Sequence, residues 1–509
     1  MKLFIVQDVK STEEELYRPH IHFTPKSGWM NDPNGMFYLN GIYHLCFQYY
    51  PGGNTWGPMH WGHAVSSDLI RWEEKPIAIY PDDKGYIFSG SAVVDVKNTS
   101  GLGENGVPPI VAVFTYHDME GEKANRTDYE TQAIAYSLDE GKTFKKYDGN
   151  PVIGNEGIKD IRDPKVIWDK ARNQWVMVLA AGQEILFYSS SNLKDWKLES
   201  NFGEGEGAHG GVWECPDLIQ MKVESTGELK WVLFVSINPG GPNEGSATQY
   251  FVGDFDGVTF SLDQSFKQEI NNTPSKGIWI DYGRDNYAGV TWSNIPDTDG
   301  RQLFIGWMSN WDYGQKVPTE SWRSAMTIAR SLSLHSTGES YKLFSHPVTE
   351  LDVYRERGIK KESVLVSKEL KLIGSENIGL SSTDVIFEFE DASSKGFEFS
   401  LRNKRGDVLS FGYDQECCEY YLNRSKAGLV DFSDKFSHRI TTAKRTSTSH
   451  YLSGRIILDK TSIELFFDGG ETVITEIFFP VAPFEELVIV PQAEALTLKR
   501  IEMFSLKTN

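Results

Sequence analysis

The sequence predicts an all-β protein in which a five-bladed β-propeller is followed by a C-terminal β-sandwich. Three observations support this fold class. Before about residue 335 the chain consists of short β-rich runs separated by Gly, Asn, Asp and Pro, and helical periodicity is scarce. Four of these runs end in the same hairpin pattern. After a charged stretch that begins at Glu350, the chain changes to alternating strands of a different kind.

Each repeat of the hairpin pattern is an apolar strand, a tight polar turn and an aromatic residue that opens the return strand. The four copies are "HAVSSDLIRWEEKP", "IAYSLDEGKTFKKY", "FYSSSNLKDWKLES" and "YFVGDFDGVTFSLD". Their turn residues Asp68, Asp139, Asn192 and Asp256 are 53 to 71 residues apart. This spacing is typical of propeller blades with variable loops, and residues 20–335 have room for five. A series of β-sandwiches is the alternative interpretation.

We expect the propeller at residues 18–340 and the sandwich at residues 371–509. Residues 341–370 are predicted to form a linker because "ELDVYRERGIKKESVLVSKEL" is rich in charge. The last domain contains alternating runs such as "DVIFEFED" and "GFEFSLRN", and Gly469-Gly470 predicts a hairpin turn. It has no tight cluster of acidic, amide and aromatic residues, so we expect it to support the propeller rather than to carry chemistry.

Charge and composition exclude several classes of partner. The net charge of −20 argues against nucleic acids and anionic membranes, whose binding depends on Lys and Arg. No apolar run reaches about 18 residues, so no membrane span is expected. The 14 Trp and 22 Tyr are numerous, and their flat apolar faces match those of sugars, although core packing accounts for most of them. A small-molecule or saccharide substrate fits this composition, and the oligomeric state stays open.

The compartment is not fixed by the sequence. The apolar start "MKLFIV" is too short for a signal peptide because "QDVKSTEEE" follows at once. We favour a secreted or periplasmic protein whose signal peptide is absent from this chain, with a cytoplasmic protein as the alternative. Cys46, Cys215, Cys417 and Cys418 are predicted to be free thiols, because adjacent cysteines seldom bridge each other and no CxxC spacing occurs.

Three acidic residues stand in unusual surroundings. In "GWMNDPNG", the Pro, Asn and Gly that follow Asp32 are typical of a turn, but a turn does not require the Trp and Met that precede it. Asp163 follows Arg162 in "DIRDPKVIW", and Glu214 stands between Trp and Cys in "GVWECPDL". Taken singly, the three are explained as a turn residue, an ion pair and a solvated side chain.

Together the three acids fit the cleavage of a glycosidic bond. This reaction takes a carboxylic acid that protonates the leaving oxygen and a carboxylate on the other side of the sugar ring. An apolar wall and a neighbouring negative charge keep such an acid protonated near neutral pH. Glu214, beside a Trp, is therefore the candidate acid, and Asp32 is the candidate nucleophile. We interpret Asp163 with Arg162 as a charged pair that binds ring hydroxyls.

Long motifs carry a resemblance to a known family. The stretches "HFTPKSGWMNDPNG", "FQYYPGGNTWGPMHWGHAVSSDLIRWEEKPIAIYPD", "FSGS", "RDPKV" and "WECPDL" closely resemble glycoside hydrolase family 32, the invertase, inulinase and levanase family. They extend from about residue 20 to 335, and the C-terminal region resembles the family's sandwich more weakly. The resemblance implies a retaining, exo-acting β-fructofuranosidase that hydrolyses terminal fructose units of sucrose or fructans through a covalent fructosyl-enzyme. It implies no cofactor.

By this resemblance, Asp32 is the nucleophile, Glu214 is the acid/base and Asp163 stabilises the transition state. We expect the carboxyl groups of Asp32 and Glu214 to lie ~5–5.5 Å apart, the separation typical of retention. The residues that the resemblance places around the substrate are Asn31, Gln48, Trp56, Phe88, Ser89, Arg162, Tyr287 and Trp311.

Other interpretations remain open at this stage. A fructosyltransferase has the same intermediate, but another sugar replaces water as the acceptor. A carbohydrate-binding propeller without turnover is an alternative of another class, although it would not need all three acids. An arabinan-type glycosidase fits the acids but not the "WMNDPNG" and "WECPD" contexts. His60 and His63 lie on a predicted strand without a third ligand, so no metal site is predicted, and Cys215 has no His partner that would make it a nucleophile.

Overall fold

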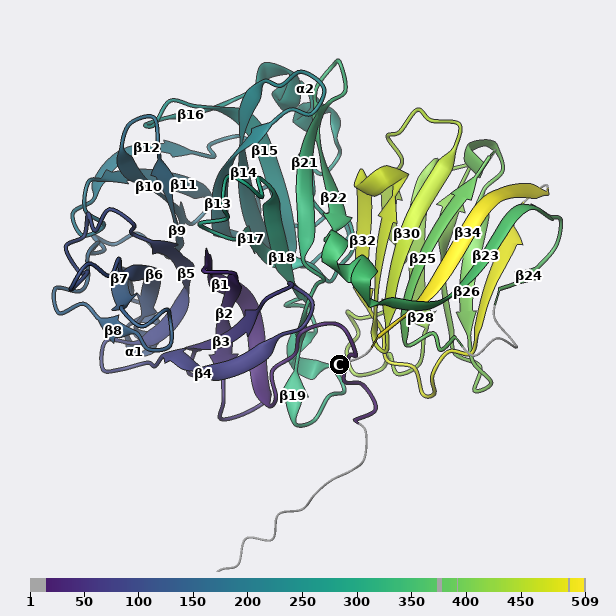
Figure 1. Cartoon of the computed structure of the whole chain (residues 1–509), viewed down its shortest axis with the longest axis horizontal. Helices are drawn as coiled ribbons and strands as arrows, with labels where there is room; N and C mark the ends of the chain where they lie inside the picture. The colour runs from purple at the N-terminus through teal and green to yellow at the C-terminus, as the bar shows by residue number, and fades with distance from the viewer. Residues whose placement is uncertain (1–14, 373–377, 391, 493–494, 508–509) are drawn as a thin grey trace, which may run out of the picture.

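The computed structural model describes residues 15–372, 378–390, 392–492 and 495–507, so the "MKLFIV" stretch lies outside the described residues. The described residues form seven β-sheets in two domains (Figure 1). Five sheets form the propeller, drawn from purple to green, and two sheets form the sandwich, drawn from green to yellow. The all-β prediction and its propeller-plus-sandwich architecture are confirmed. In the described part of the chain, no helix has both the length and the apolar character needed to cross a bilayer.

Each propeller blade is an antiparallel sheet built from consecutive strands. The first two blades contain β1 (Gly28–Leu39), β2 (Ile42–Tyr50), β3 (His60–Ser66) and β4 (Glu73–Ile79), then β5 (Tyr86–Val94), β6 (Ile110–His117), β7 (Glu130–Ser137) and β8 (Lys145–Lys146). The next two contain β9 (Ile161–Asp169), β10 (Gln174–Ala181), β11 (Glu184–Ser190) and β12 (Lys197–Phe202), then β13 (Val212–Lys222), β14 (Leu229–Asn238), β15 (Ala247–Phe255) and β16 (Phe260–Leu262).

The fifth blade is less regular than the other four. It contains β17 (Tyr287–Thr291), β18 (Gln302–Met308), β21 (Arg330–Ser336) and β22 (Tyr341–Pro347), and the short β20 (Ala325–Met326) also pairs with β18. The short β19 (Trp322–Arg323) pairs in parallel with β1 and so joins this region to the first blade. The inner strands contact one another in the order β1, β5, β9, β13, β17 and back to β1, which closes the ring. Residues distant in the sequence therefore meet around one axis.

The repeated hairpin pattern corresponds to the outer turn of the first four blades. Asp68 follows β3, and its side chain accepts a hydrogen bond from the Ile70 amide at 2.9 Å. Asp256 accepts one from the Thr259 amide at 2.7 Å in the fourth blade. These bonds satisfy the turn's backbone donors, and the aromatic residue then packs inward. The fifth blade has the turn "STGESY", which lacks an Asp or Asn, so the pattern did not reveal it.

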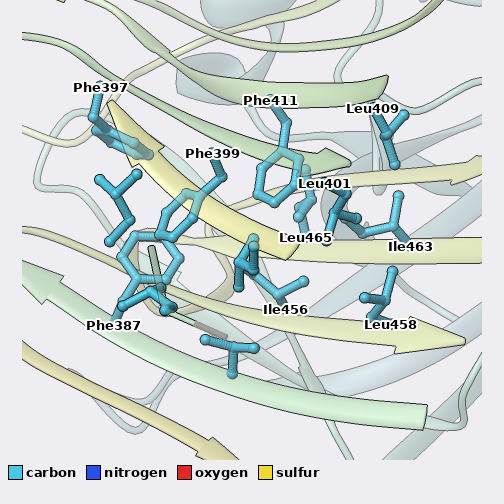
Figure 2. Packing of buried hydrophobic residues seen from close by; sticks show 14 of the residues in the cluster. Phe387, Phe397, Phe399, Leu401, Leu409, Phe411, Ile456, Leu458, Ile463 and Leu465 are labelled. Carbon is cyan, nitrogen blue, oxygen red and sulfur yellow. The ribbon is translucent and has the colours of Figure 1, made fainter. Parts of the chain in front are cut away.

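The sandwich packs two six-stranded sheets face to face. One contains β23 (Arg355–Val366), β34 (Leu496–Leu506), β25 (Ser382–Phe389), β30 (Leu452–Asp459), β31 (Ser462–Phe467) and β32 (Thr472–Ile477). The other contains β24 (Leu370–Lys371), β33 (Glu486–Pro491), β26 (Phe397–Arg402), β27 (Val408–Asp414), β28 (Glu419–Lys426) and β29 (Thr441–Lys444). Phenylalanines from both sheets, including Phe387, Phe397, Phe399 and Phe411, interlock between them (Figure 2). This apolar core holds the domain together.

Short helical segments connect these strands. The α-helices are α1 (Met119–Lys123) and α2 (Gln264–Asn272), each with an Asp side chain capping its first amides. The 3₁₀ segments are η1 (Gly314–Lys316), η2 (Thr349–Tyr354), η3 (Ala392–Ser394) and η4 (Asp468–Gly470).

The linker predicted at residues 341–370 is wrong. Strand β22 belongs to the fifth blade, and β23 pairs with β34 as the edge strand of a sandwich sheet. Only the single helical segment η2 separates the two strands. Most side chains of Arg355–Val366 are exposed or half-buried, so their charge reflects the solvent-facing position of an edge strand rather than a flexible connection.

Candidate active site

Every inner strand of the propeller has an irregularity near its beginning. The pairing with the neighbouring strand shifts register within β1 at Met30/Pro33, β5 at Ile87/Gly90, β9 at Arg162/Lys165, β13 at Glu214/Asp217 and β17 at Tyr287/Val290. Such bulges redirect side chains and are common next to active sites. The three acids and several predicted binding residues lie inside or beside these shifts, so the same local device recurs in all five blades.

Three of the bulges share a strained backbone position. Asp163, Cys215 and Ala288 have φ values of 66°, 46° and 53°, a region that non-glycine residues seldom adopt. These three residues immediately follow Arg162, Glu214 and Tyr287, whose side chains are hydrogen-bonded to one another. Arg162 donates to Glu214 Oε1 from Nε at 3.2 Å and from Nη2 at 3.0 Å. The Tyr287 hydroxyl donates a short hydrogen bond to Glu214 Oε2. Equivalent positions of three neighbouring blades therefore meet on Glu214.

Asp32 is held by hydrogen bonds on both of its oxygens. Ser89 Oγ donates to Oδ2 at 2.8 Å, and Asn31 Nδ2 donates to Oδ1 at 3.0 Å. The Trp29 indole nitrogen donates in turn to Asn31 Oδ1 at 2.7 Å, which fixes the orientation of that amide. This explains the Trp before the Asp-Pro-Asn-Gly sequence. These residues form part of β1 and its bulge rather than a free turn.

Burial raises the pKa of Asp32 to about 6, and the negative charge of Glu214 acts in the same direction. Hydrogen bonds from Asn31, Ser89 and Cys215 oppose this rise because they favour the ionised carboxylate. A carboxyl group with such a pKa changes its charge close to neutral pH.

Asp163 is more deeply buried and has a larger shift. The Cys215 amide donates to its Oδ2 at 3.0 Å, and the Asp163 amide donates to Thr115 Oγ1 at 3.0 Å. Burial raises the pKa of Asp163 to about 8. The charge of Arg162 opposes this effect, and the charges of Glu214 and Asp32 add to it. At neutral pH this group therefore keeps a proton.

The Cys215 thiol connects the acids. Its Sγ lies 3.5 Å from Oδ2 of Asp32 and 3.5 Å from Oδ2 of Asp163. Burial, followed by the neighbouring carboxylates, raises the pKa of this thiol well above its ordinary value, so it stays a neutral donor. Because Cys215 also follows Glu214 directly, the three acids from β1, β9 and β13 form one cluster. The prediction that all four cysteines are free thiols is confirmed.

Arg162 forms its ion pairs with Glu130, Asp160 and Glu214 rather than with Asp163, so the interpretation of Arg162 and Asp163 as a charged pair is wrong. Its Nη1 donates to Asp160 at 2.9 Å and to Glu130 at 3.1 Å, while its other edge binds Glu214. Glu130 is fully buried and also contacts His117 Nδ1 at 3.1 Å. Sequence reasoning missed these residues. The only local signal for Glu130 is an acidic residue at the start of the largely buried strand β7.

The predicted aromatic residues pack around the same cluster. Phe88 stacks on the His117 ring at 4.1 Å and meets Trp56 edge-on at 6.1 Å. Trp311 stacks on Trp29 at 5.9 Å. Phe88, Trp56 and Trp311 are half-buried, so part of each ring is accessible to solvent. Apolar ring faces beside carboxyl groups suit the binding of a sugar.

Gln48, the remaining predicted binding residue, is buried and donates from Nε2 to the Ile87 carbonyl at 3.0 Å, next to Phe88. His60 and His63 bind different partners. His60 Nδ1 is 2.8 Å from the Pro58 carbonyl, whereas His63 Nε2 is 3.0 Å from Nδ1 of His44.

Two family models together match both domains of the chain. The model described as "Glycosyl hydrolases family 32 N-terminal domain" matches residues 22–347. The model described as "Glycosyl hydrolases family 32 C terminal" matches residues 350–505. Their junction falls at η2, between the propeller and the sandwich.

Curated relatives align with most of the chain. A levanase of Bacillus subtilis (strain 168) is 46% identical over 473 residues, which cover 92% of this chain and 67% of the relative. An extracellular exo-inulinase of Aspergillus awamori is 38% identical over 495 residues, which cover 92% of this chain and 90% of the relative.

Solved structures share the whole architecture. The crystal structure of exo-inulinase from Aspergillus awamori superimposes with a TM-score of 0.87 and 34% identity, and the match covers 97% of this chain and 99% of that one. The structure of β-fructofuranosidase from Schwanniomyces occidentalis complexed with fructosyl-erythritol gives a TM-score of 0.85 and 35% identity, over 97% and 98% of the two chains.

Proposed function

The chain belongs to glycosyl hydrolases family 32, and from this premise we propose that the protein is an exo-acting β-fructofuranosidase that removes terminal fructose from fructans. The names of its relatives, levanase and exo-inulinase, support both the reaction and the polymeric substrate. The family resemblance predicted from the motifs is thereby confirmed.

One observation supports the chemistry most directly. Carboxyl groups from three blades form a single cluster, in which Asp32 and Asp163 share the Cys215 sulfur and Glu214 precedes that cysteine in the chain. In most glycoside hydrolases two carboxyl groups have different roles, and different surroundings set these roles. Asp32 is held by neutral hydrogen-bond donors, whereas Glu214 is held by Arg162 and Tyr287.

In the first step, the ionised carboxylate of Asp32 attacks the anomeric carbon of the terminal fructose. Glu214 gives its proton to the oxygen that leaves, so the glycosidic bond breaks while an ester bond to Asp32 forms. Asn31 and Ser89 fix both oxygens of the nucleophile and thereby reduce the motion needed to reach the carbon. Phe88, Trp56 and Trp311 form the walls of the fructose pocket.

In the second step, Glu214 removes a proton from water, and the resulting attack releases fructose with its original anomeric configuration. Retention of this kind requires the carboxyl groups of Asp32 and Glu214 to lie about 5–5.5 Å apart. Asp163 binds ring hydroxyls in both steps. Because its pKa is raised to about 8, it has a proton at neutral pH with which it can donate a hydrogen bond to the sugar.

Trapping the intermediate tests these roles. In Glu214→Ala, β-fructosyl fluoride should still form the ester because fluoride leaves without a proton, while hydrolysis of the ester is slow, so acid quenching should leave one fructosyl group on the peptide that contains Asp32. The double variant Asp32→Asn/Glu214→Ala is the control and should carry none. An adduct on another peptide, or a first product of inverted configuration by NMR, would contradict the assignment.

Fructans rather than sucrose are the proposed main substrates. We expect kcat/KM for levan and inulin to exceed that for sucrose, and fructose to be the only early product because the enzyme cleaves from chain ends. Release of intermediate oligosaccharides would contradict exo action. Free glucose in clear excess over free fructose from concentrated sucrose would indicate a fructosyltransferase, and saccharide binding without any product would indicate a non-catalytic propeller.

We also propose that the protein acts outside the cytoplasm, since fructan polymers do not cross membranes freely and relatives are named extracellular. Fractionation of the native host should place the activity in the medium or at the cell envelope. Activity confined to the cytoplasmic fraction would reject this proposal.

A further inference from the structure

Arg424 of the sandwich reaches the propeller and is buried between the domains. Arg424 lies in β28 and is 2% exposed. Its Nη1 donates to Asp285 Oδ2 at 2.6 Å and its Nη2 donates to the Tyr313 hydroxyl at 2.7 Å. Glu476 lies 2.6 Å from Nη1, and Nε donates to the Phe436 carbonyl at 2.9 Å. Two of these partners, Asp285 and Tyr313, belong to propeller loops.

The first of these loops docks against an edge strand of the sandwich. The Tyr282 amide donates to the Val473 carbonyl in β32 at 2.8 Å, and the Asp285 amide donates to the Thr475 carbonyl at 3.1 Å. The approach is so close that a Cβ at Gly283 would lie 2.1 Å from the Thr475 oxygen. Tyr287, which donates to Glu214, follows Asp285 by only two residues. The position of the sandwich therefore constrains the start of β17.

The second loop leads to the other side of the cluster. The Tyr313 hydroxyl donates to Asp285 Oδ1 at 2.7 Å and accepts a hydrogen bond from Arg424. Asp285 and Arg424 therefore both fix the position of the Tyr313 side chain. Trp311 is two residues earlier and stacks on Trp29, whose indole nitrogen orients Asn31. Asn31 in turn donates to Asp32, which connects this loop to the proposed nucleophile.

Neighbouring contacts tie the two loops to each other. Arg284 Nη2 donates to Asp312 Oδ2 at 3.0 Å, and Asn310 Nδ2 donates to the Arg284 carbonyl at 2.7 Å. The Tyr313 ring lies 5.1 Å from the Arg284 guanidinium and 5.0 Å from that of Arg424. The two loops consequently form one rigid unit whose polar centre includes a residue from the other domain.

We propose that Arg424 is a positioning residue for the fructosidase reaction: through Asp285 and Tyr313 the sandwich fixes the loops that carry Tyr287 and Trp311. The inference rests on the proposed function. Arg424 itself touches no atom of the acid cluster, and its effect passes through backbone and ring contacts. The sandwich is thus a part of the catalytic apparatus rather than a support alone.

Kinetics of Arg424→Met, Arg424→Lys and a matched interface variant test the proposal. Because small misplacements of reacting groups reduce rates strongly, we expect kcat/KM of Arg424→Met for inulin to fall by about 10- to 100-fold. The loss should appear in both kcat, through Tyr287, and KM, through Trp311. Arg424→Lys keeps the charge and one donor and should recover part of the loss.

Asp459→Asn is the matched control, because Asp459 is a buried sandwich carboxylate at the same interface that binds His22 and not the two loops. It should lower the melting temperature but keep kcat/KM within about two-fold of wild type. Tyr313→Phe removes only one hydroxyl, so it keeps the test usable if Arg424→Met does not fold, and it should lower kcat/KM by about 3- to 10-fold.

Wild-type kinetics in folded Arg424→Met or in Tyr313→Phe would overturn the inference, and so would an equal loss in Asp459→Asn. Failure of the proposed function gives a different result, because wild-type protein would then release no fructose at all.

Discussion

Buried charge is arranged in opposite ways in two regions of this protein. At the propeller–sandwich interface, Asp459 and Glu464 accompany His22 and Arg330. Burial acts against ionisation of both carboxyls, but His22 and, for Glu464, Arg330 hold their pKa values below the ordinary range. The same contacts raise the pKa of His22 to about 9 against the effect of burial. In the acid cluster, burial raises the pKa of Asp32 to about 6 and that of Asp163 to about 8.

Direct contact with a cation explains this difference. His22 contacts Asp459 at 2.8 Å and Glu464 at 2.9 Å, and Arg330 contacts Glu464 as well. In the acid cluster, the described contacts of Asp32 and Asp163 are with neutral donors, so we call these two carboxyl groups unmatched. Carboxylates in contact with cations therefore stay charged and fasten the domains, whereas the unmatched carboxyl groups hold protons closer to neutral pH.

The largest expected effect comes from Asp32→Asn, which removes one unmatched charge. Fructose release from inulin should fall by about four orders of magnitude or more, because the variant lacks the proposed nucleophile. The melting temperature at pH 8 should rise by a few degrees, because one of the mutually repelling buried carboxylates is gone. Initial rates and thermal unfolding of the same preparation check both. A loss of stability together with activity would show that the Asp32 carboxylate does not destabilise the folded protein.

Removal of a cation from the interface should reduce mainly the stability of the protein. Arg330→Met leaves Glu464 and Asp281 buried without their shared guanidinium, so we expect a loss of about 3–5 kcal/mol in unfolding free energy. Urea unfolding measures this change. Lys170→Met, which removes an exposed pair with Asp297, is the control and should change stability by less than about 1 kcal/mol. Equal effects in the two variants would contradict the account.

The interface should also weaken in alkali. His22 has a folded-state pKa of about 9, above its ordinary 6.5, so its stabilisation is fully present below pH 6.5 and is lost as the pH rises through about 9. His22→Gln should therefore melt lower than wild type at pH 6, with a difference that shrinks by pH 10. A difference that does not change with pH would show that His22 is not charged in the native protein.

The smallest expected effect concerns the pKa of Asp32. Because Asp32 must be ionised to act as the proposed nucleophile, kcat/KM should decline as the pH falls below about 6. Ser89→Ala removes a hydrogen bond that favours the carboxylate, so this acidic limb should move upward by about 0.5–1 pH unit. Ser91→Ala, on the same strand, is the control, since Ser91 Oγ donates to the Pro164 carbonyl instead. An unmoved limb in Ser89→Ala would contradict the role of Ser89.

The residues next to the three acids in the sequence revealed part of this arrangement. Asp32, Asp163 and Glu214 stand beside residues that their backbone bulges place in contact, so short motifs contain the information. The blade repeat was visible because four turns use the same Asp or Asn chemistry. The edge strand β23 was predicted to be a linker because exposed edge strands and linkers are both rich in charged residues.

Long-range partners left no such trace. Glu130 meets Arg162 from 32 residues away, and Arg424 meets Asp285 across 139 residues and a domain boundary. A lone Glu in a strand or a lone Arg in a sandwich is common, and only the closed ring and the docked domain make them partners. The positive φ values of Asp163, Cys215 and Ala288 likewise follow from strand pairing rather than from residue type.

Thermal unfolding of Asp163→Asn as a function of pH tests the contrast between the two regions most directly. The folded protein keeps the Asp163 proton up to about pH 8, whereas the unfolded chain loses it near its ordinary pKa of 3.8, so wild-type stability declines between these values. We expect equal melting temperatures near pH 4 and a higher melting temperature of the variant whose excess over wild type grows up to about pH 8. A variant that melts at or below the wild-type temperature throughout this range would contradict it.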